Sequence, residues 1–543
     1  MTSARYNIIR RLTSILAASG VLVFIAYQLI SDDYMVEASQ HRKRSASGPF
    51  DEQPFAEVIV HLDLKGAPPI VSVYRWLFPL LKLNGVRSVL MEYEDMLPYY
   101  GELSVIKRGR HYNDSDIREI SRFSVLFFSM FPHANVQIAA ENSLEIIPLV
   151  QTFGHLEFVL KYPAFLHLRE NPGADNTICP SDPQSLELIR EMLKQIHILH
   201  PRSTRIHIGA DEASHIAEDE RCRKRLRLFD QTSEHRAKEK LKLAHIAKVA
   251  RLSRDLGFKE VFAWNDMFDK SDVEDMRDAK LGDLITPVVW GYKADVTEPG
   301  YFPDHLFDRL SKVFSKLFFA SAFKGATRID EDFIDVDRYL RNHMSYVKLY
   351  QENRQACLGM FSGFYSPFAL QGRVGGIIVT GWQRYMHHAP LCELLMVSIP
   401  SLVTDLVYLL NVTRNRNDIW RDVRKLLRCP AHLESTVVPE KIGEMLFVPH
   451  KDAFLNLCDF QGSRLYKLIM EDFYLLKWKV RHSSQLSNTT SLILEEIEGL
   501  ANLVADELRN YHYPEDVDEF VTTKILSLKE KLDRRSSKES DDS

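Results

Sequence analysis

The chain has 543 residues, 45% of them hydrophobic, and a formal net charge of −5. That length can bury one large domain of about 350 residues and a smaller one. A weakly acidic chain lacks the basic face that nucleic-acid binding usually needs, so we expect no nucleic-acid partner.

The first feature along the chain is an apolar run at residues 12–30, which is long enough to cross a bilayer. Arginines precede it and acidic residues follow it. The positive-inside rule then predicts a cytosolic tail at 1–11, an uncleaved signal anchor at 12–30 and a lumenal remainder, the topology of a single-pass type II membrane protein. A cleaved signal peptide is the alternative, because Ala17–Ser19 offers small residues.

Residues 31–54 are polar and predict a stem. Its basic cluster at 41–44 fits a solvated linker or a processing site that frees the lumenal part. We expect the Golgi lumen as the location, with a secreted or lysosomal form as the alternative after cleavage. Three sequons agree with a lumenal chain and predict glycosylation at Asn113, Asn411 and Asn488. Some of the six cysteines can pair there, although their partners cannot be read from the sequence.

From residue 58 onwards, short apolar runs alternate with longer helical patterns, such as the one at 234–256. This alternation is typical of a parallel sheet, and eight strands over about 330 residues fit a (β/α)8 TIM barrel, an α/β fold. We place the catalytic barrel at residues 55–410. The expected strands are 58–63, 88–93, 144–150, 205–209, 260–264, 285–290, 317–320 and 376–380.

The end of the chain has a different pattern. Leucines, isoleucines and valines recur at helical spacing between 492 and 508. We expect a C-terminal helical region at 411–533 packed on the barrel, rather than a dimerising coiled coil, and whether the chain forms a homodimer stays open. The charged, Ser-rich residues 534–543 predict a disordered tail.

The fourth expected strand leads into two adjacent carboxylates, Asp211 and Glu212. Barrels of this kind keep their active sites at the carboxyl ends of the strands. Neighbouring carboxylates repel, so at least one should keep its proton near neutral pH, as a general acid must. Taken alone, the pair also fits the first turn of a helix, where acidic residues are common.

Three of the six tryptophans, Trp264, Trp290 and Trp382, stand at expected carboxyl ends of strands. One such residue fits ordinary packing, whereas three at equivalent places predict an aromatic-walled pocket beside the acid pair. Aromatic faces suit the C–H face of a sugar ring or an N-acetyl methyl group. The polar residues expected to bind hydroxyls are Asp63, Glu94 and His155.

His155 and His207 form no compact metal-binding pattern. We therefore expect neither a metal nor another cofactor. A neutral histidine that orients a carboxylate is the better interpretation of both residues.

At these residues the chain resembles glycoside hydrolase family 20, the β-N-acetylhexosaminidases. The family motif His-x-Gly-x-Asp-Glu matches residues 207–212, and its Gly-His pair matches residues 154–155. The chain is most similar to the hexosaminidase D branch, through segments that follow one another in the same order. These are residues 61–69, 92–96, 148–155, 320–326 and 380–385.

The resemblance implies an exo-β-N-acetylhexosaminidase that removes terminal, non-reducing β-linked GalNAc or GlcNAc from a glycoprotein or glycolipid. It implies substrate-assisted retaining hydrolysis, in which the 2-acetamido oxygen of the sugar is the nucleophile. Glu212 is then the acid and later the base, and Asp211 accepts a hydrogen bond from the acetamido N–H. Tyr292 is the first candidate to hold the acetamido oxygen, and Tyr385 is the second.

The chain departs from the family in three ways. The substrate-binding arginine of the first strand is absent and Asp63 and Lys65 stand there, the usual preceding domain is missing, and a membrane anchor is added. Two alternatives to an enzyme stay open. One is a catalytically inactive lumenal glycan-binding protein, and the other is a membrane-tethered structural protein with a decayed barrel.

Overall fold

The computed structural model describes residues 53–124, 144–355, 370, 372–433, 437–486 and 490–541. The chain divides into two compact units, residues 1–51 and 52–543, and the first lies outside the described residues. The expected cytosolic tail, anchor and nearly all of the stem therefore fall outside them too. Among the helices within the described ranges, none has the length and hydropathy needed to cross a bilayer.

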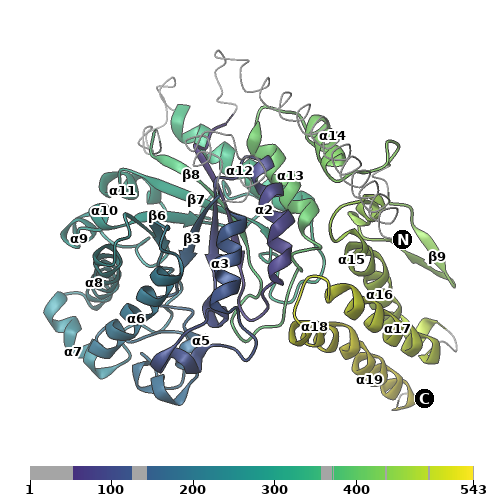
Figure 1. Ribbon diagram of the computed structural model, residues 1–543, viewed down its shortest axis with the longest axis horizontal. Coiled ribbons are helices and arrows are strands. Elements are labelled where there is room, and N and C mark those ends of the chain that lie inside the picture. The colour runs from purple at the N-terminus through teal and green to yellow at the C-terminus, as the bar shows by residue number, and fades with distance from the viewer. Residues whose placement is uncertain are drawn as a thin grey trace, which may run out of the picture. The chain divides into compact units, whose positions relative to one another are not determined.

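Eight parallel strands close into a barrel in chain order (Figure 1). β1 and β8 complete the ring, with Ile59 paired to Ile378. All eight predicted strands are confirmed, and the largest difference is in β7, which continues beyond Ala320 to Lys324. The strands are β1 Glu57–Asp63, β2 Ser88–Glu92, β3 Glu145–Leu149, β4 Arg205–His207, β5 Glu260–Trp264, β6 Thr286–Trp290, β7 Leu317–Lys324 and β8 Val374–Gly381.

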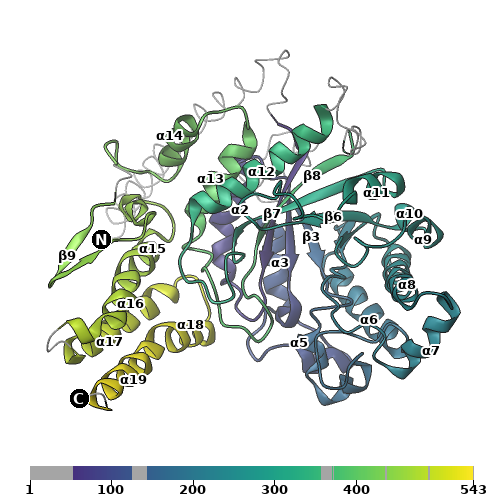
Figure 2. The same cartoon turned by 180° about the vertical axis from the view of Figure 1, so that it is seen from behind.

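Helices follow the strands and surround the barrel (Figures 1 and 2). Local capping fixes where several of them begin: Asn113 forms a capping box, and Asp182 and Ser233 accept backbone N–H groups of the first turn. The main helices are α2 Tyr74–Leu83, α3 Asp114–Phe123, α6 Pro183–Leu199, α8 Glu234–Asp255, α9 Val273–Asp278, α10 Leu281–Leu284, α11 Leu306–Val313, α12 Val336–Gln355 and α13 Ile399–Leu410. Shorter elements in the connecting loops include η2 Glu94–Met96, α5 Glu157–Leu160, η5 Pro163–Leu168 and α7 Glu220–Phe229.

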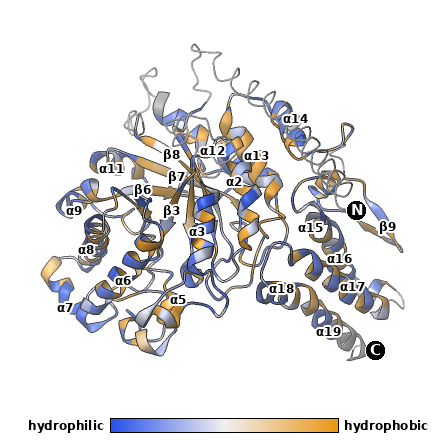
Figure 3. Cartoon of the chain, in the orientation of Figure 1, coloured by the Kyte–Doolittle hydropathy of each residue, from blue (hydrophilic) through white to orange (hydrophobic). Residues whose placement is uncertain are grey.

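The strands are apolar and the surrounding helices are apolar on one side, as the colouring in Figure 3 shows. The strands are therefore buried on both faces, as parallel strands usually are. Inside the barrel, side chains from β1, β2, β3, β5, β6, β7 and β8 form one core cluster that ends in tryptophans at the carboxyl ends of the strands. The barrel is thus filled, and its chemistry must lie at an end.

The amino-terminal end of the barrel is held by a cluster of polar side chains around Arg205. Its guanidinium donates to both oxygens of Glu57 at 2.7 and 2.8 Å, to Glu145 Oε2 at 2.7 and 3.0 Å and to Ser88 Oγ at 2.6 Å. Burial works to raise the pKa of Glu57, but the bonds and charge of Arg205 outweigh it and lower that pKa. We call these four residues the amino-end cluster.

The described part of the C-terminal region is mainly helical, as its spacing predicts, and it stands beside the barrel near α2 and α13 (Figures 1 and 2). The Ile70 N–H donates to the Tyr511 carbonyl, and Arg384 pairs with Glu519 at 2.7 Å. A hairpin of β9 Glu440–Ile442 and β10 Met445–Phe447 was not predicted. The helices are α14 Arg416–Leu426, α15 Ser463–Lys467, α16 Tyr474–Arg481, α17 Thr490–Leu508, α18 Pro514–Phe520 and α19 Ser527–Asp541.

Two further features of this region differ from or extend the sequence analysis. The predicted disordered tail is wrong as far as Asp541, because α19 runs to that residue. Alternating charges explain the helix, since Arg534 pairs with Glu530 one turn earlier at 3.1 Å. A disulfide joins Cys429 to Cys458, a pairing that the sequence left open.

Candidate active site at the carboxyl ends of the strands

The predicted site residues meet at the carboxyl-terminal end of the barrel, because all eight strands run in the same direction. The loop after β3 carries His155, and the loop after β4 carries the acid pair. Trp264, Trp290 and Trp382 end or follow β5, β6 and β8. We call this set the carboxyl-end site.

Unusual backbone conformations place the acid pair. Gly209, Ala210 and Glu212 have φ values of 60°, 65° and 43°, a region that residues other than glycine rarely adopt. Such strain persists only where the surrounding structure holds it, and it is frequent at functional sites. Gly154 has no room for a side chain, because a Cβ there would overlap the carbonyl oxygen of Asp211. This glycine therefore lets the β3 loop lie directly against the acid pair.

The two carboxylates of the pair are unlike in exposure and share one histidine. The Asp211 side chain is 9% exposed and that of Glu212 is 54% exposed. His155 Nε2 lies 3.5 Å from Asp211 Oδ2 and 3.2 Å from Glu212 Oε2. Burial lowers the pKa of His155, but the charge of Asp211 and the bond to Glu212 outweigh it and raise that pKa to about 10. His155 lies against both carboxylates, and its raised pKa makes it a cation rather than the neutral ring expected from the sequence.

The proton affinities of the pair also differ. Burial raises the pKa of Asp211 to about 7, although the charge of His155 opposes the shift. The hydrogen bond from His155 lowers the pKa of Glu212. One carboxyl group is thus held ready to keep a proton, but burial rather than repulsion by its neighbour is the main cause, and without substrate that group is Asp211 and not the proposed acid.

Asp266, which the sequence analysis did not assign to the site, fixes two parts of it. Its Oδ2 accepts the Glu212 backbone N–H at 2.8 Å, and its Oδ1 accepts the Trp290 indole N–H at 3.1 Å. Its position two residues after Trp264, at the end of β5, is the signal that could have identified it.

The predicted aromatic group is present. The ring of Tyr292 stacks on Trp290 at 5.3 Å and meets Trp382 edge-on at 6.2 Å, and Trp382 lies 6.0 Å from Trp264. Trp290 and Trp382 are half-buried, whereas Trp264 is only 1% exposed and belongs to the barrel core. Tyr385, the second candidate for the acetamido oxygen, is 56% exposed.

Tyr292 is thus the better candidate of the two. Burial raises its pKa well above the usual value, so its hydroxyl stays protonated and can donate a hydrogen bond.

Asp63 and Glu94, the predicted hydroxyl-binding residues, surround a buried lysine. Lys65 Nζ lies 3.4 Å from Asp63 Oδ2 and 3.6 Å from Glu94 Oε1, and 5.6 Å from the centre of the Trp382 ring. Asp63 also accepts the backbone N–H groups of Lys65 and Gln383. Both oxygens of Asp63 are therefore engaged, whereas Glu94 Oε1 is buried without a hydrogen-bond partner.

His207 holds the turn after β4 rather than a carboxylate. Its Nδ1 accepts the Gly209 N–H at 3.0 Å, and its ring lies 4.3 Å from that of Trp264. Burial lowers its pKa to about 3, so the ring is neutral. The sequence analysis expected this ring to orient a carboxylate, whereas its hydrogen bond goes to the backbone.

Two groups of described side chains have the spacing of metal ligands: Glu94, Asp95 and His387, and Glu170, Cys179 and Cys222. In the first group the ring of His387 is already engaged. Its Nδ1 lies 2.9 Å from Glu94 Oε2, and its Nε2 lies 2.8 Å from the ammonium nitrogen of Lys161. Neither group contains a residue of the acid pair.

The predicted glycosylation sites lie in different surroundings. Asn113 is exposed and caps α3, where its side-chain oxygen accepts the Ser115 and Asp116 N–H groups. Asn411 is half-buried just after α13, and its oxygen accepts the Thr413 N–H. Asn488 falls outside the described residues.

Comparisons with known proteins agree with this geometry. The profile of the glycosyl hydrolase family 20 catalytic domain matches residues 112–295, which include both carboxylates. Hexosaminidase D of Bos taurus is 38% identical over 355 residues, covering 65% of this chain and 92% of the relative. Hexosaminidase D of Homo sapiens is 38% identical over 359 residues, 66% of each chain.

Among solved structures, the β-N-acetylhexosaminidase from Bacteroides fragilis NCTC 9343 matches with a TM-score of 0.46 at 15% identity, over 69% of this chain and 71% of that one. The sequence relatives carry the assignment, since one of them aligns over nearly its whole length. The chain belongs to glycosyl hydrolase family 20, with the β-N-acetylhexosaminidase activity of that family.

Proposed function

We propose that the chain removes terminal, non-reducing β-linked GalNAc or GlcNAc from glycoconjugates by substrate-assisted retaining hydrolysis. The observation that carries this proposal is the unlike environment of two adjacent carboxylates beside an aromatic group. Asp211 is buried and its Oδ1 lacks a hydrogen-bond partner, whereas Glu212 is 54% exposed. A buried oxygen that can accept a hydrogen bond, on Asp211, thus lies next to an exposed carboxyl group, on Glu212.

The unpaired Asp211 Oδ1 suits the acetamido N–H of the substrate. A hydrogen bond there turns the acetamido oxygen towards the anomeric carbon and stabilises the positive charge that develops on the ring it forms. The neutral hydroxyl of Tyr292 donates to the acetamido oxygen, and Trp290 and Trp382 contact the sugar and the N-acetyl methyl group. Glu212 protonates the leaving oxygen and then activates water.

Substrate binding itself prepares the protonation states. A sugar over Glu212 removes water from a side chain that is now 54% exposed, and desolvation raises a carboxyl pKa. The new hydrogen bond from the acetamido N–H lowers the pKa of Asp211. The proton that the unliganded site favours on Asp211 thus moves to Glu212 when the substrate is bound.

Turnover of paired aryl β-GalNAc and β-GlcNAc glycosides by the purified full chain tests the proposal. We expect release of the terminal sugar with retained configuration, observed by NMR of the first product, and no activity on internal residues. A folded chain that binds a thiazoline-type inhibitor without releasing any sugar would contradict hydrolysis and favour a glycan-binding protein.

We also propose a single-pass type II topology in the Golgi, with residues 31–543 in the lumen and residues 12–30 as the anchor. Support comes from the exposed sequon at Asn113 and from the Cys429–Cys458 disulfide, since such bonds persist in oxidising compartments. In sealed microsomes we expect protease protection and a glycan that Asn113→Gln removes. Protease-accessible chain without a glycan would contradict this topology.

A further inference from the structure

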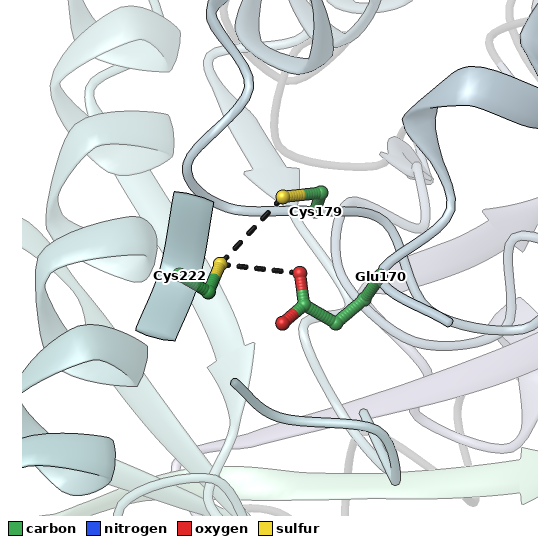
Figure 4. Close-up of side chains that lie close together, drawn as sticks. All are labelled: Glu170, Cys179 and Cys222. Carbon is green, nitrogen blue, oxygen red and sulfur yellow. Dashed lines mark hydrogen bonds between the residues drawn. The ribbon is translucent and has the colours of Figure 1, made fainter. Parts of the chain in front are cut away.

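Cys179 and Cys222 form a buried pair away from the acid pair. Cys179 lies between η5 and α6, and Cys222 lies in the first turn of α7. Their sulfur atoms are 3.6 Å apart, and both residues are fully buried. Figure 4 shows the two side chains pointing towards each other, with the Glu170 carboxylate beside Cys222. Cys222 donates to that carboxylate at 3.1 Å.

The surroundings do not favour a metal ion between these thiols. Glu170 Oε1 already accepts the Glu218 and Asp219 N–H groups. The guanidinium of Arg225 donates to Ser181 Oγ, which also accepts from Cys222, so a fixed positive charge is linked to the sulfur through two hydrogen bonds. A cation bound there would face that charge and would have only one carboxylate oxygen available.

The segments that contain the two cysteines are connected to the loops that hold His155 and the acid pair. The Ile178 N–H donates to the Phe153 carbonyl, and the Leu156 N–H donates to the Asn176 carbonyl. The segment just before Cys179 is therefore hydrogen-bonded to the β3 loop on both sides of His155. Asn176 reaches across to Ser214 Oγ at 2.7 Å, just after the acid pair. α7 with Cys222 is the next element along the chain from that pair.

We propose that Cys179 and Cys222 form a disulfide that joins the support of the β3 loop to the end of the β4 loop. The sulfur atoms are 3.6 Å apart and need to approach to about 2.0 Å, the length of an S–S bond. Both thiols lose their protons and together two electrons, which pass to a disulfide oxidant such as oxidised glutathione, leaving two molecules of reduced thiol. Because the pair is buried, the bond forms during folding, before the chain closes around it.

The bond fixes His155 relative to Asp211 and Glu212. Noncovalent contacts alone hold these residues at 3.2 and 3.5 Å, and small displacements of catalytic groups lower rates steeply. A covalent link between the two loops keeps this spacing while substrate enters. Its effect is separate from that of the Cys429–Cys458 bond, which lies within the C-terminal region.

Peptide mapping tests the bond directly. The full chain, produced in the secretory pathway of a eukaryotic host, is denatured in N-ethylmaleimide without reductant and digested. We expect one cross-linked peptide pair that contains Cys179 and Cys222, alongside the Cys429–Cys458 pair. Cys392, a buried free cysteine, should carry the label and so controls for access to buried thiols.

Label on both Cys179 and Cys222 would overturn the proposal. Label on both, together with about one equivalent of zinc per chain by elemental analysis, would also overturn it and assign the group as a metal site. Neither result depends on hydrolase activity, so this test stands apart from that of the proposed function.

A matched pair of double variants tests the effect on the site. In the Cys429→Ser/Cys458→Ser chain, dithiothreitol should lower Tm by about 3–8 °C and kcat by about twofold to tenfold, through the remaining pair. In the Cys179→Ser/Cys222→Ser chain, dithiothreitol should leave kcat unchanged. Equal losses of kcat on reduction in both variants would show that Cys179 and Cys222 do not fix the catalytic loops.

Discussion

The two ends of the barrel treat buried carboxylates in opposite ways. At the amino-terminal end, Glu57 shares the guanidinium of Arg205 with Glu145, at 2.7–3.0 Å, and the pKa of Glu57 is lowered. At the carboxyl-terminal end, Asp211 lies 3.5 Å from His155, which also contacts Glu212, and the pKa of Asp211 is raised to about 7. The first arrangement stabilises the fold, and the second leaves a carboxyl group that can exchange its proton.

The two ends also differ in how many buried polar atoms lack a hydrogen-bond partner. At the carboxyl-end site these are Asp211 Oδ1, Glu94 Oε1, His207 Nε2, Trp264 Nε1 and Trp382 Nε1, whereas in the amino-end cluster it is Glu145 Oε1. Each unmet group costs about 1–3 kcal/mol unless a ligand or water satisfies it. One barrel thus uses charge for stability at one end and accepts a local loss of stability at the end that binds substrate.

The largest expected effect is the loss of catalysis when Glu212, the proposed acid, is replaced. Glu212→Gln should lower kcat by about 10²–10⁴-fold on substrates with poor leaving groups, because the proton donor is lost. Activated aryl substrates should recover much of the first step. Since the side chain is half exposed, Tm should change little. Full activity of this variant on a natural glycan would show that Glu212 is not the acid.

Arg205→Met, at the amino-terminal end of the barrel, should lower stability rather than kcat. It should lower the free energy of unfolding by about 2–4 kcal/mol, because Glu57, whose side chain is only 16% exposed, and the more exposed Glu145 lose their shared partner. The kcat of the folded fraction should stay near that of the wild type. Urea unfolding and kinetics below the transition measure both. A variant with wild-type stability would mean that the amino-end cluster contributes little.

The effect of replacing each tryptophan should depend on how deeply its ring is buried. Trp290→Ala and Trp382→Ala should weaken a thiazoline-type inhibitor by about 1–3 kcal/mol, because each loses a contact with the sugar. Trp264→Ala should mainly lower stability, since that ring is 1% exposed in the barrel core. Calorimetric titration and thermal unfolding of each variant separate the two. Unchanged inhibitor affinity in a folded variant would place that ring outside the pocket.

The smallest expected effect is a difference in how stability depends on pH. The folded-state pKa of Asp211, about 7, lies above its unfolded value, so its ionisation costs stability as pH rises towards 7. Asp211→Asn should therefore gain stability over the wild type with rising pH. The pKa of Glu57 is lowered instead, so its contribution is present above the unfolded pKa and is lost in acid.

Glu57→Gln should thus be less stable than the wild type near neutral pH and should converge with it as pH falls through the folded-state pKa. Urea midpoints between pH 3 and 8 give both curves. Parallel curves for Asp211→Asn and Glu57→Gln would contradict the difference between the two ends.

Short-range patterns were enough to predict the barrel and to place most of the expected site residues at its carboxyl-terminal end. Each strand is a short apolar run: Trp264 and Trp290 end β5 and β6, Trp382 follows β8, and Asp211 lies in the turn after β4. What the sequence could not indicate depends on partners far away in the chain. The charge of His155 needs two carboxylates more than 50 residues later, and the link from Asp266 to Glu212 spans 54 positions.

Lys65 shows the same limit. Its position on the first loop suggested only that an expected arginine is missing, whereas in the structure it lies between Asp63 and Glu94. The assignment of His207 to a carboxylate failed because the closest partner is its own backbone, two residues on, at Gly209. The helix of the last residues was missed because polar composition was weighed above i,i+4 charge pairing.

The close approach at Gly154 has a consequence for attempts to change the enzyme's specificity. The β3 and β4 loops interlock there, so any side chain introduced at position 154 would displace the backbone that holds the acid pair. Variation is better directed to the connection after β6, where residues 298–300 are exposed and outside that interlock. New substrate preferences are therefore expected to arise from insertions in that connection, while the two interlocked loops change only together.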